Sequence, residues 1–166
     1  MTSTSSHGRL RDLIALALLA AIAFGCKIAL AALPNIHLTA VILLLCVIAF
    51  GWRSLYACAV YILLEGLVYG FGLWWIGYLL CWPVLILLGL AVRKANSYVL
   101  YAVVGAISGF TFGALCAVPY VVLSGWRFAL TWWLAGIPYD LIHGISNFVL
   151  CLLLLKPLAK LLHKIK

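Results

Sequence analysis

The segment LIALALLAAIAFGCKIALAAL, residues 13–33, decides the fold class of this chain. Lys27 is the one charged residue of this segment, and Pro34 directly follows the last residue of the segment. At about 1.5 Å of rise per residue, a helix of this length crosses the roughly 30 Å hydrocarbon core of a bilayer. The run is too long for a signal peptide and has no convincing cleavage site, so we predict a membrane-spanning helix.

The composition extends this prediction to the whole chain. Of its 166 residues, 68% are hydrophobic and 8% are charged, which is more apolar surface than a soluble domain of this size buries. The net charge of +8 comes from 11 Lys and Arg against 3 acids. In a membrane protein such an excess marks cytoplasmic ends and does not indicate nucleic-acid binding. The six cysteines lie in apolar runs without paired spacing, so we expect no structural disulfide.

Five further apolar runs follow the first, at residues 38–50, 55–72, 75–92, 98–118 and 136–155. We therefore predict an all-α membrane protein with a bundle of six transmembrane helices. The run at 38–50 is short for a full crossing, and a tilted or partly re-entrant segment is the alternative. No linker or repeat divides the chain, so we expect one membrane domain over residues 1–166, with a short polar cytoplasmic N-terminus at 1–11.

The positive charges predict the orientation of the six helices. With both termini inside, nine of the eleven Lys and Arg residues are cytoplasmic: Arg9, Arg11, Arg53, Arg93, Lys94, Lys156, Lys160, Lys164 and Lys166. The opposite orientation leaves only Lys27 and Arg127 inside. The positive-inside rule therefore predicts that both termini lie in the cytoplasm. We expect a multi-pass protein of a cell membrane, from a bacterium.

The three predicted outer connections, residues 33–39, 70–75 and 119–135, are aromatic and nearly uncharged. Tryptophans and one tyrosine gather there: Trp74, Trp75, Tyr78, Trp126, Trp132 and Trp133. An interfacial aromatic belt explains them, and so does a lid that stacks on a small ligand.

Burying a polar or ionisable group in a bilayer costs free energy, so each such group within the predicted spans needs an explanation. Counted at 1.5 Å per residue, five of them fall in the outer half of the bundle: Lys27, Glu65, Asp140, His143 and Asn147. A cavity that is open to the outside and holds a small polar molecule accounts for this convergence. An ion pair of Lys27 with Glu65 or Asp140 is the structural alternative. Pro138 suits a first helical turn, so Asp140 is explained nearly as well as a helix start.

Catalysis and metal binding have weaker support. One histidine with two acids is a poor ligand set, and His37 joins it only if its loop folds inward. The segment GAISG, residues 105–109, has serine in a GxxSG pattern rather than GxSG. Gly105, Gly109 and Gly113 recur every four residues, which favours close helix packing. We expect no metal, no cofactor and no enzymatic activity; an intramembrane enzyme using Asp140 and His143 remains an alternative.

Several passages resemble a known family. Six short spans, AxxxA at Ala17 and Ala21, and the passages LPNIHL, LLEGLVYGFGLWWIGYL and GIPYDLIHGISNF are similar to substrate-binding S components of energy-coupling factor (ECF) transporters. The resemblance covers nearly the whole chain and implies high-affinity uptake of a water-soluble vitamin or related micronutrient. It also implies two kinds of partner, a membrane coupling subunit and two cytoplasmic ATPases. The chain has no Walker motif of its own, in agreement with a subunit that its partners energise.

The resemblance and the polar pattern together assign candidate residues. Docking to the coupling subunit is expected at the alanine face of the first helix, at Ala17, Ala20 and Ala21. Substrate binding is expected at outer positions: Lys27, Asn35, His37, Glu65, Tyr69, Trp74, Trp75, Tyr78, Trp132, Trp133, Asp140, His143 and Asn147. The alternative to this function is a small carrier or channel that needs no partners. The near absence of ionisable groups from the inner half of each span speaks against such a pathway.

Overall fold

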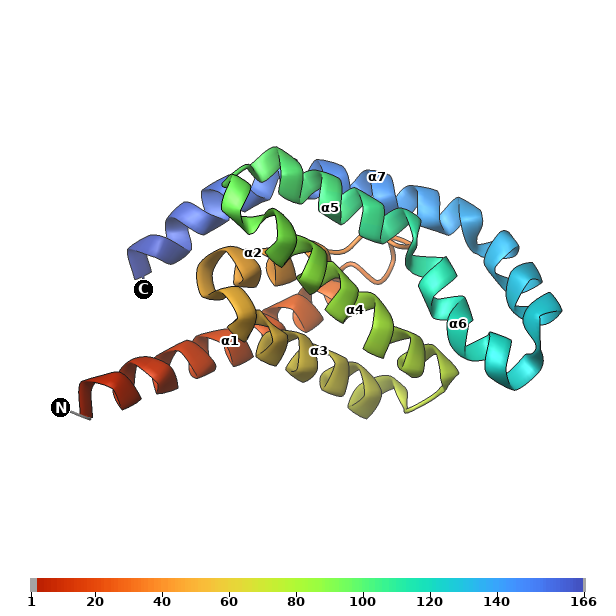
Figure 1. Ribbon diagram of the computed structural model, residues 1–166, viewed down its shortest axis with the longest axis horizontal. Helices are drawn as coiled ribbons and strands as arrows, with labels where there is room; N and C mark the ends of the chain where they lie inside the picture. The colour runs from red at the N-terminus through yellow and green to blue at the C-terminus, as the bar shows by residue number, and fades with distance from the viewer. Residues whose placement is uncertain (1–2, 166) are drawn as a thin grey trace.

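The computed structural model describes residues 3–165, with side chains for residues 8–164. This part of the chain is helical and contains no strand. Both termini lie at the left of Figure 1. The elements are α1 (Ser3–Ala29), α2 (Thr39–Phe50), η1 (Gly51–Arg53), α3 (Ser54–Tyr69), α4 (Leu73–Val92), η2 (Arg93–Ala95), α5 (Tyr98–Phe110), α6 (Phe112–Ser124) and α7 (Trp126–Ile165).

Five stretches of helix in the described residues are long and apolar enough to cross a membrane: Gly8–Ala29, Thr39–Tyr69, Leu73–Ala95, Tyr98–Ser124 and Trp126–Lys164. This confirms the predicted class, an all-helical protein with membrane-spanning character. The second stretch joins α2, η1 and α3 without a gap. Its first part, α2, has only 12 residues, and at about 1.5 Å per residue it is too short to cross the hydrocarbon core upright.

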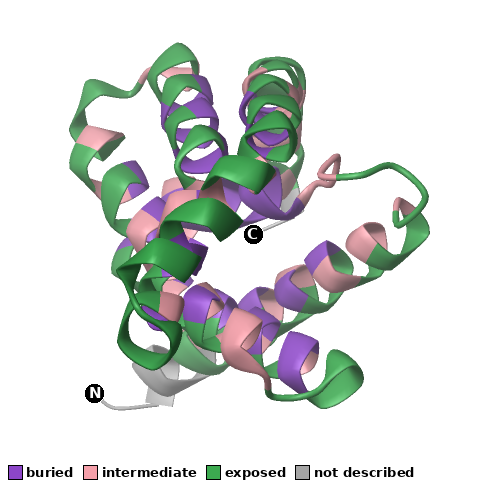
Figure 2. Cartoon of the chain, turned by 90° about the vertical axis from the view of Figure 1, so that its right-hand side faces the viewer, coloured by how far each residue is buried: buried purple, intermediate pink, exposed green. Residues whose placement is uncertain are grey.

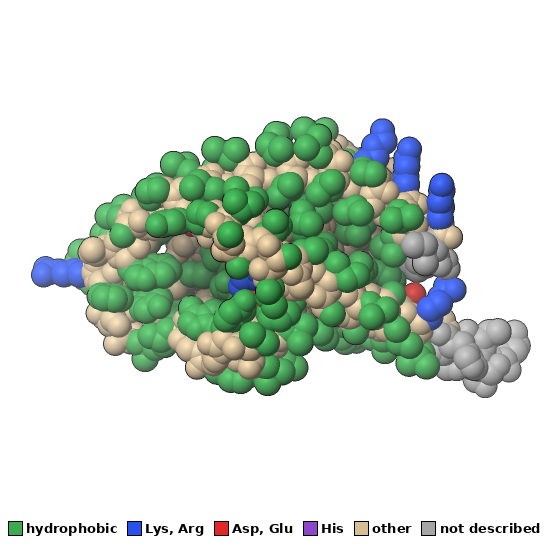
Figure 3. All heavy atoms as spheres, turned by 180° about the vertical axis from the view of Figure 1, so that it is seen from behind, with side chains coloured by type: hydrophobic (Ala, Val, Ile, Leu, Met, Phe, Trp, Pro, Cys, Tyr) green, Lys and Arg blue, Asp and Glu red, His purple; other side chains and the backbone are tan. Residues whose placement is uncertain are grey.

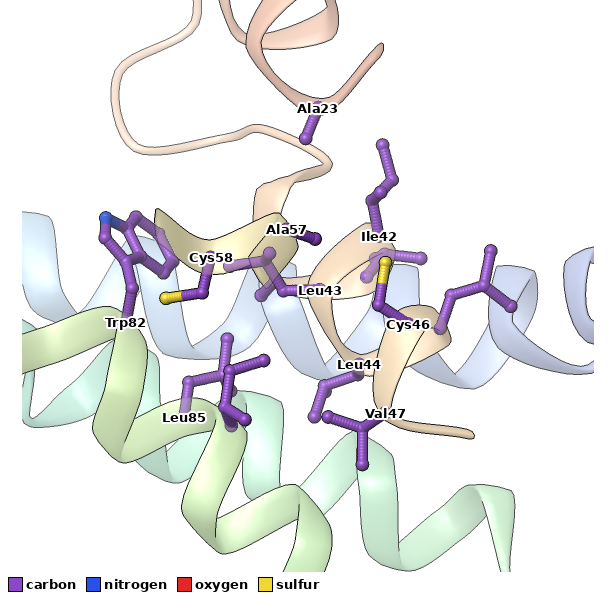
Figure 4. Packing of buried hydrophobic residues seen from close by; sticks show 14 of the residues in the cluster. Ala23, Ile42, Leu43, Leu44, Cys46, Val47, Ala57, Cys58, Trp82 and Leu85 are labelled. Atoms are coloured by element: carbon purple, nitrogen blue, oxygen red, sulfur yellow. The ribbon is translucent and has the colours of Figure 1, made fainter. Parts of the chain in front are cut away.

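Helix α2 lies at the centre of the core. Nine of its twelve residues are buried by the rest of the protein, in keeping with a helix that is apolar on all sides. Figure 4 shows Leu43, Leu44 and Val47 of α2 facing Leu85 of α4. Because α1, α3, α4 and α7 all pack against α2, this short helix fixes the positions of the others.

The outer surface of the bundle is also apolar. The described helices turn buried residues inward and exposed ones outward in Figure 2, and many exposed residues carry large apolar side chains. Leu13 on α1, Leu67 on α3 and Val122 on α6 are 44%, 64% and 83% exposed. Contiguous apolar surface of this extent is typical of a face that meets lipid.

Small residues bring α5 and α6 close to α7. A methyl group added at Gly109 would lie 2.6 Å from the backbone of Gly144, and one added at Gly113 would lie 2.5 Å from the Asp140 carboxylate. A methyl group added at Gly105 would lie 3.0 Å from the sulfur of Cys151 and 3.6 Å from the backbone of Asn147. The three glycines therefore have the predicted packing role against α7, with direct backbone-to-backbone approach at Gly109.

The predicted outer connection at residues 119–135 is wrong. Helix α6 continues to Ser124, and α7 begins at Trp126. Gly125 alone separates the two helices, and its φ of 83° is a backbone conformation that glycine adopts without strain. Pro138 therefore lies inside α7 instead of in a first turn. A proline inside a membrane helix is tolerated because the backbone groups that it frees find other partners.

Two smaller corrections concern the ends of other helices. The first apolar run leaves the helix at Ala29, so residues 30–38 form a connection between α1 and α2. Helix α4 begins at Leu73, which places Trp74 and Trp75 in its first turn instead of in a loop. On α1, Ala17 and Ala21 are exposed, whereas Ala20 is fully buried in the core.

Candidate functional site

A cavity of about 430 Å³ lies where the α1–α2 connection meets four helices. Its size is within the range of small-molecule sites. More than half of its lining residues come from the end of α1 and the connection: Lys27, Leu30, Ala31, Leu33, Pro34, Asn35, Ile36 and His37. The rest comes from the other helices: Glu65, Tyr69, Trp74, Tyr78, Phe112 and His143.

An ion pair crosses one side of the cavity. The ammonium nitrogen of Lys27 lies 2.6 Å from Oε2 of Glu65, whose side chain is fully buried, whereas the Lys27 side chain is 23% exposed. The same nitrogen lies 5.3 Å from the ring centroids of both Tyr69 and Tyr78, close enough for cation–π attraction. Of the two pairings that the sequence left open, the structure shows the one between Lys27 and Glu65.

Two histidines meet on the other side. The rings of His37 and His143 have centroids 4.9 Å apart, and His143 is only 1% exposed. Neither nitrogen of His143, nor Nδ1 of His37, has a hydrogen-bond partner in the described protein. A neutral imidazole has one donor and one acceptor nitrogen, so this pair offers a ligand both functions. Burial, with smaller contributions from His143 and Lys27, lowers the pKa of His37 to about 3, so His37 is neutral at pH 7.

Aromatic rings form the wall between the two polar groups. Tyr78 contacts Trp74, Trp82 and Phe112 edge to face, with centroids 5.1, 5.7 and 5.6 Å apart. Phe112 also contacts His143, at 4.9 Å. Such edge-to-face contacts stabilise the rings in fixed orientations. The cavity therefore has a rigid aromatic wall between an ion pair and two imidazoles.

The α1–α2 connection is held against α7. Asn35 has a φ of 57°, a left-handed conformation that asparagine tolerates better than most residues. Its side-chain amide donates to the carbonyl oxygen of Tyr139 at 3.0 Å, and the hydroxyl of Ser146 donates to its backbone carbonyl at 3.2 Å. These two bonds turn the connection inward and place His37 beside His143.

Comparisons with models of protein families, with curated proteins and with solved structures give no significant match.

Asp140 does not line the cavity. Its Oδ1 accepts the backbone N–H of Gly113 at 2.9 Å, and Gly113 is the second residue of α6. The prediction that Asp140 lies at the start of its own helix is therefore wrong, since Asp140 lies inside α7 and its carboxylate instead caps the start of α6. The physical reason is unchanged: the unpaired N–H groups and positive dipole end of α6 favour a carboxylate.

Four more of the predicted binding residues lie away from the cavity lining. Asn147 is fully buried, and its amide donates to the carbonyl oxygen of Gly105 at 3.2 Å, joining α7 to α5. The indole of Trp75 donates to the carbonyl oxygen of Ile62 at 2.8 Å. Trp132 stacks on Tyr120, with centroids 5.0 Å apart, and Trp133 lies beside the Asp140 carboxylate. The structure thus brings together eight of the thirteen predicted residues in one cavity: Lys27, Asn35, His37, Glu65, Tyr69, Trp74, Tyr78 and His143.

Sequence reasoning missed Phe112 and most of the α1–α2 connection. Phe112 is one apolar residue among many, and no pattern in the sequence separates it from a lipid-facing side chain. The connection carried a usable signal, since Pro34 and Asn35 together mark a tight turn. No group of three or more histidine, cysteine or acidic side chains that could hold a metal ion is found in the described residues.

Proposed function

We propose that the protein is the substrate-binding S component of an ECF transporter and takes up a water-soluble vitamin or a related micronutrient. The observation that carries the proposal is the cavity, where polar groups from α1, α3 and α7 meet an aromatic wall. Its lining includes His143 but not Asp140, which accepts the backbone N–H of Gly113 instead. This separation supports binding over the alternative enzyme that uses Asp140 and His143 together.

The proposed topology has six membrane segments with both termini in the cytoplasm, and α2 counts as a segment of its own. Two observations support it. The chain termini lie at one end of the bundle in Figure 1, and most of the Lys and Arg side chains visible in Figure 3 gather at one end of the molecule. Positive charge is retained on the cytoplasmic side, so the cavity would open outward.

The proposed ligand is a flat molecule that is uncharged or zwitterionic. Lys27 and Glu65 neutralise each other, and His37 is neutral at pH 7, so the cavity has no excess charge to hold a phosphorylated compound. The imidazole nitrogens favour a ligand with both donors and acceptors on its edge. The aromatic wall of Trp74, Tyr78 and Phe112 favours a heterocycle.

The proposed surface for the coupling subunit lies on α1. Ala17, Ala21, Gly25 and Ala29 recur every four residues, and all four are exposed. A stripe of small residues lets a second helix approach closely in a membrane. We propose this stripe as the docking face. Ala20 is buried behind it, so a docked partner would not touch Ala20.

Mass spectrometry of small molecules that co-purify with the protein tests the binding function. We expect the wild-type chain to retain a micronutrient, His143→Leu to lose it and Trp132→Leu to keep it, since Trp132 lies outside the cavity lining. The chain alone should not move the compound across a vesicle membrane. Transport without ATPases would contradict the proposal and favour a carrier.

A second experiment tests docking. Ala17→Trp and Ala21→Trp should spare ligand binding and abolish uptake by cells that also produce the coupling subunit and ATPases. Leu18→Trp is the matched control, because Leu18 is 60% exposed on the same helix but lies outside the stripe. Equal loss of uptake in all three variants would contradict a specific docking face.

A further inference from the structure

The end of the bundle away from the cavity carries cations that the chain cannot neutralise. The whole sequence has three acidic residues. Asp12 pairs with Arg53 at 2.6 Å, Glu65 pairs with Lys27, and Asp140 accepts the N–H of Gly113. No carboxylate side chain pairs with Arg93, Lys94 or Lys160, and all three side chains are exposed, so they are free to meet an anionic group of another molecule.

Two hollows beside these cations share a wall. The first, about 260 Å³, is lined by Ile48, Arg93, Asn96, Tyr98 and Tyr101. The second, about 590 Å³, is lined mostly by apolar residues with a basic rim: Ile48, Ala49, Tyr98, Ala159, Lys160, Leu162 and His163. Ile48 and Tyr98 belong to both. We call the two hollows together the basal groove; it lies between the end of α2, η2, the start of α5 and the end of α7.

The guanidinium group of Arg93 lies over Gly51 beside this groove. A methyl group added at Gly51 would lie 3.1 Å from Nη1 of Arg93, so the guanidinium packs on the Gly51 backbone. The arginine side chain presents a planar set of donors that matches a phosphate group. Tyr98 and Tyr101 add two hydroxyl groups to the lining, and tyrosine is a residue type that is enriched where membrane proteins meet lipid headgroups.

We propose that the basal groove binds one anionic phospholipid. Its phosphate would lie on Arg93 with Lys160 at the rim, and an acyl chain would lie along Ile48, Ala159 and Leu162. A polar hollow joined to an apolar one matches the headgroup and the acyl chain of a lipid. Free phosphate would need only the polar hollow. Basic pockets between membrane helices on the cytoplasmic side bind anionic headgroups in this manner. The proposal does not depend on the function proposed for the cavity.

Native mass spectrometry of the full chain in detergent tests this site. The protein is mixed with equal amounts of phosphatidylglycerol and phosphatidylcholine that carry the same acyl chains. We expect one phosphatidylglycerol per protein in preference to phosphatidylcholine. Removing one cation should weaken phosphatidylglycerol binding by about fivefold in Arg93→Gln and in Lys160→Gln, which corresponds to about 1 kcal/mol for each basic residue.

Arg127→Gln is the matched control, since Arg127 is an exposed cation that stacks on Trp126 in the α6–α7 hairpin, outside the groove lining. It should leave lipid binding unchanged. Lys160 is exposed, so Lys160→Gln keeps the test valid if Arg93→Gln fails to fold. Equal binding of the two lipids, equal losses in all three variants, or displacement of the lipid by millimolar inorganic phosphate would each overturn the proposal.

Discussion

The ammonium group of Lys27 lies 2.6 Å from the carboxylate of Glu65, and this contact joins α1 to α3 beside the cavity. The two residues are 38 positions apart in the sequence, and Glu65 is fully buried. Removing one partner of a buried pair leaves a charge without compensation, whereas replacing both by uncharged residues can be nearly neutral. The pair therefore allows structural and ligand-binding roles to be separated by experiment.

Lys27→Met should lower the free energy of unfolding by about 3 kcal/mol, because the Glu65 carboxylate stays buried without a partner. The double variant Lys27→Met with Glu65→Gln should recover most of that loss. Thermal unfolding in detergent measures both. Arg53→Met is the control: it breaks an exposed pair with Asp12, and its cost should not exceed about 1 kcal/mol. A double variant as unstable as Lys27→Met would contradict this account.

Asp140→Ala should loosen the first turn of α6 while leaving ligand affinity unchanged. The carboxylate accepts the N–H of Gly113, and loss of such a cap costs about 1 kcal/mol. Hydrogen exchange of residues 112–124, followed by mass spectrometry, should show faster exchange in Asp140→Ala. Asp140→Asn keeps an acceptor oxygen and should retain protection. Lost ligand binding with unchanged exchange would instead assign Asp140 to the binding site.

Gly109→Ala should destabilise the contact between α5 and α7. The added methyl group would lie 2.6 Å from the Gly144 backbone, and no side-chain rotation relieves a clash with backbone atoms. We expect a cost of about 1–3 kcal/mol in thermal unfolding. Gly136→Ala is the matched control, because a methyl group there meets no atom within 4 Å. Equal effects of the two substitutions would show that helix propensity, not packing, decides the outcome.

The sequence placed part of the cavity correctly for a simple geometric reason. Because a helix rises about 1.5 Å per residue, a position in the chain gives a depth in the membrane, and Lys27, Glu65 and His143 are predicted at a similar depth. The structure places all three in the lining of one cavity. Their role in binding substrate stays a prediction. Helix rise fails where a helix boundary is misjudged. With Pro138 taken as a helix start, residues 119–135 are predicted as an outer connection, whereas Gly125 alone interrupts the helices there.

The position of His37 lay beyond sequence reasoning for a different reason. Residues 30–38 form no regular helix, so no period relates position to direction. The connection is instead held by Asn35, whose side-chain amide donates a hydrogen bond to the carbonyl oxygen of Tyr139, 104 positions along the chain. A contact of that range leaves no local pattern. His37 is a predicted substrate-binding residue whose neighbours the sequence does not indicate, and the structure places it in the cavity beside His143.

His37 should make the stability of the protein depend on pH below neutrality. Burial, then His143 and Lys27, lower its pKa in the folded protein from 6.5 to about 3. Between these values the unfolded chain binds a proton that the folded protein does not. The stabilisation is therefore complete above pH 6.5 and is lost as the pH falls towards 3, by at most about 1.4 kcal/mol per pH unit.

Thermal unfolding of the wild type and of His37→Gln, followed from about pH 7.5 down to about pH 4.5, measures this effect. The groups that face His37 are His143, Trp82 and Lys27, and they remain in both proteins, so the difference between the two curves isolates His37. We expect the wild type to lose stability more steeply than His37→Gln. His163→Gln, which changes an exposed histidine near the C-terminus, should follow the wild-type curve. Parallel curves for wild type and His37→Gln would contradict a lowered pKa of His37 in the folded protein.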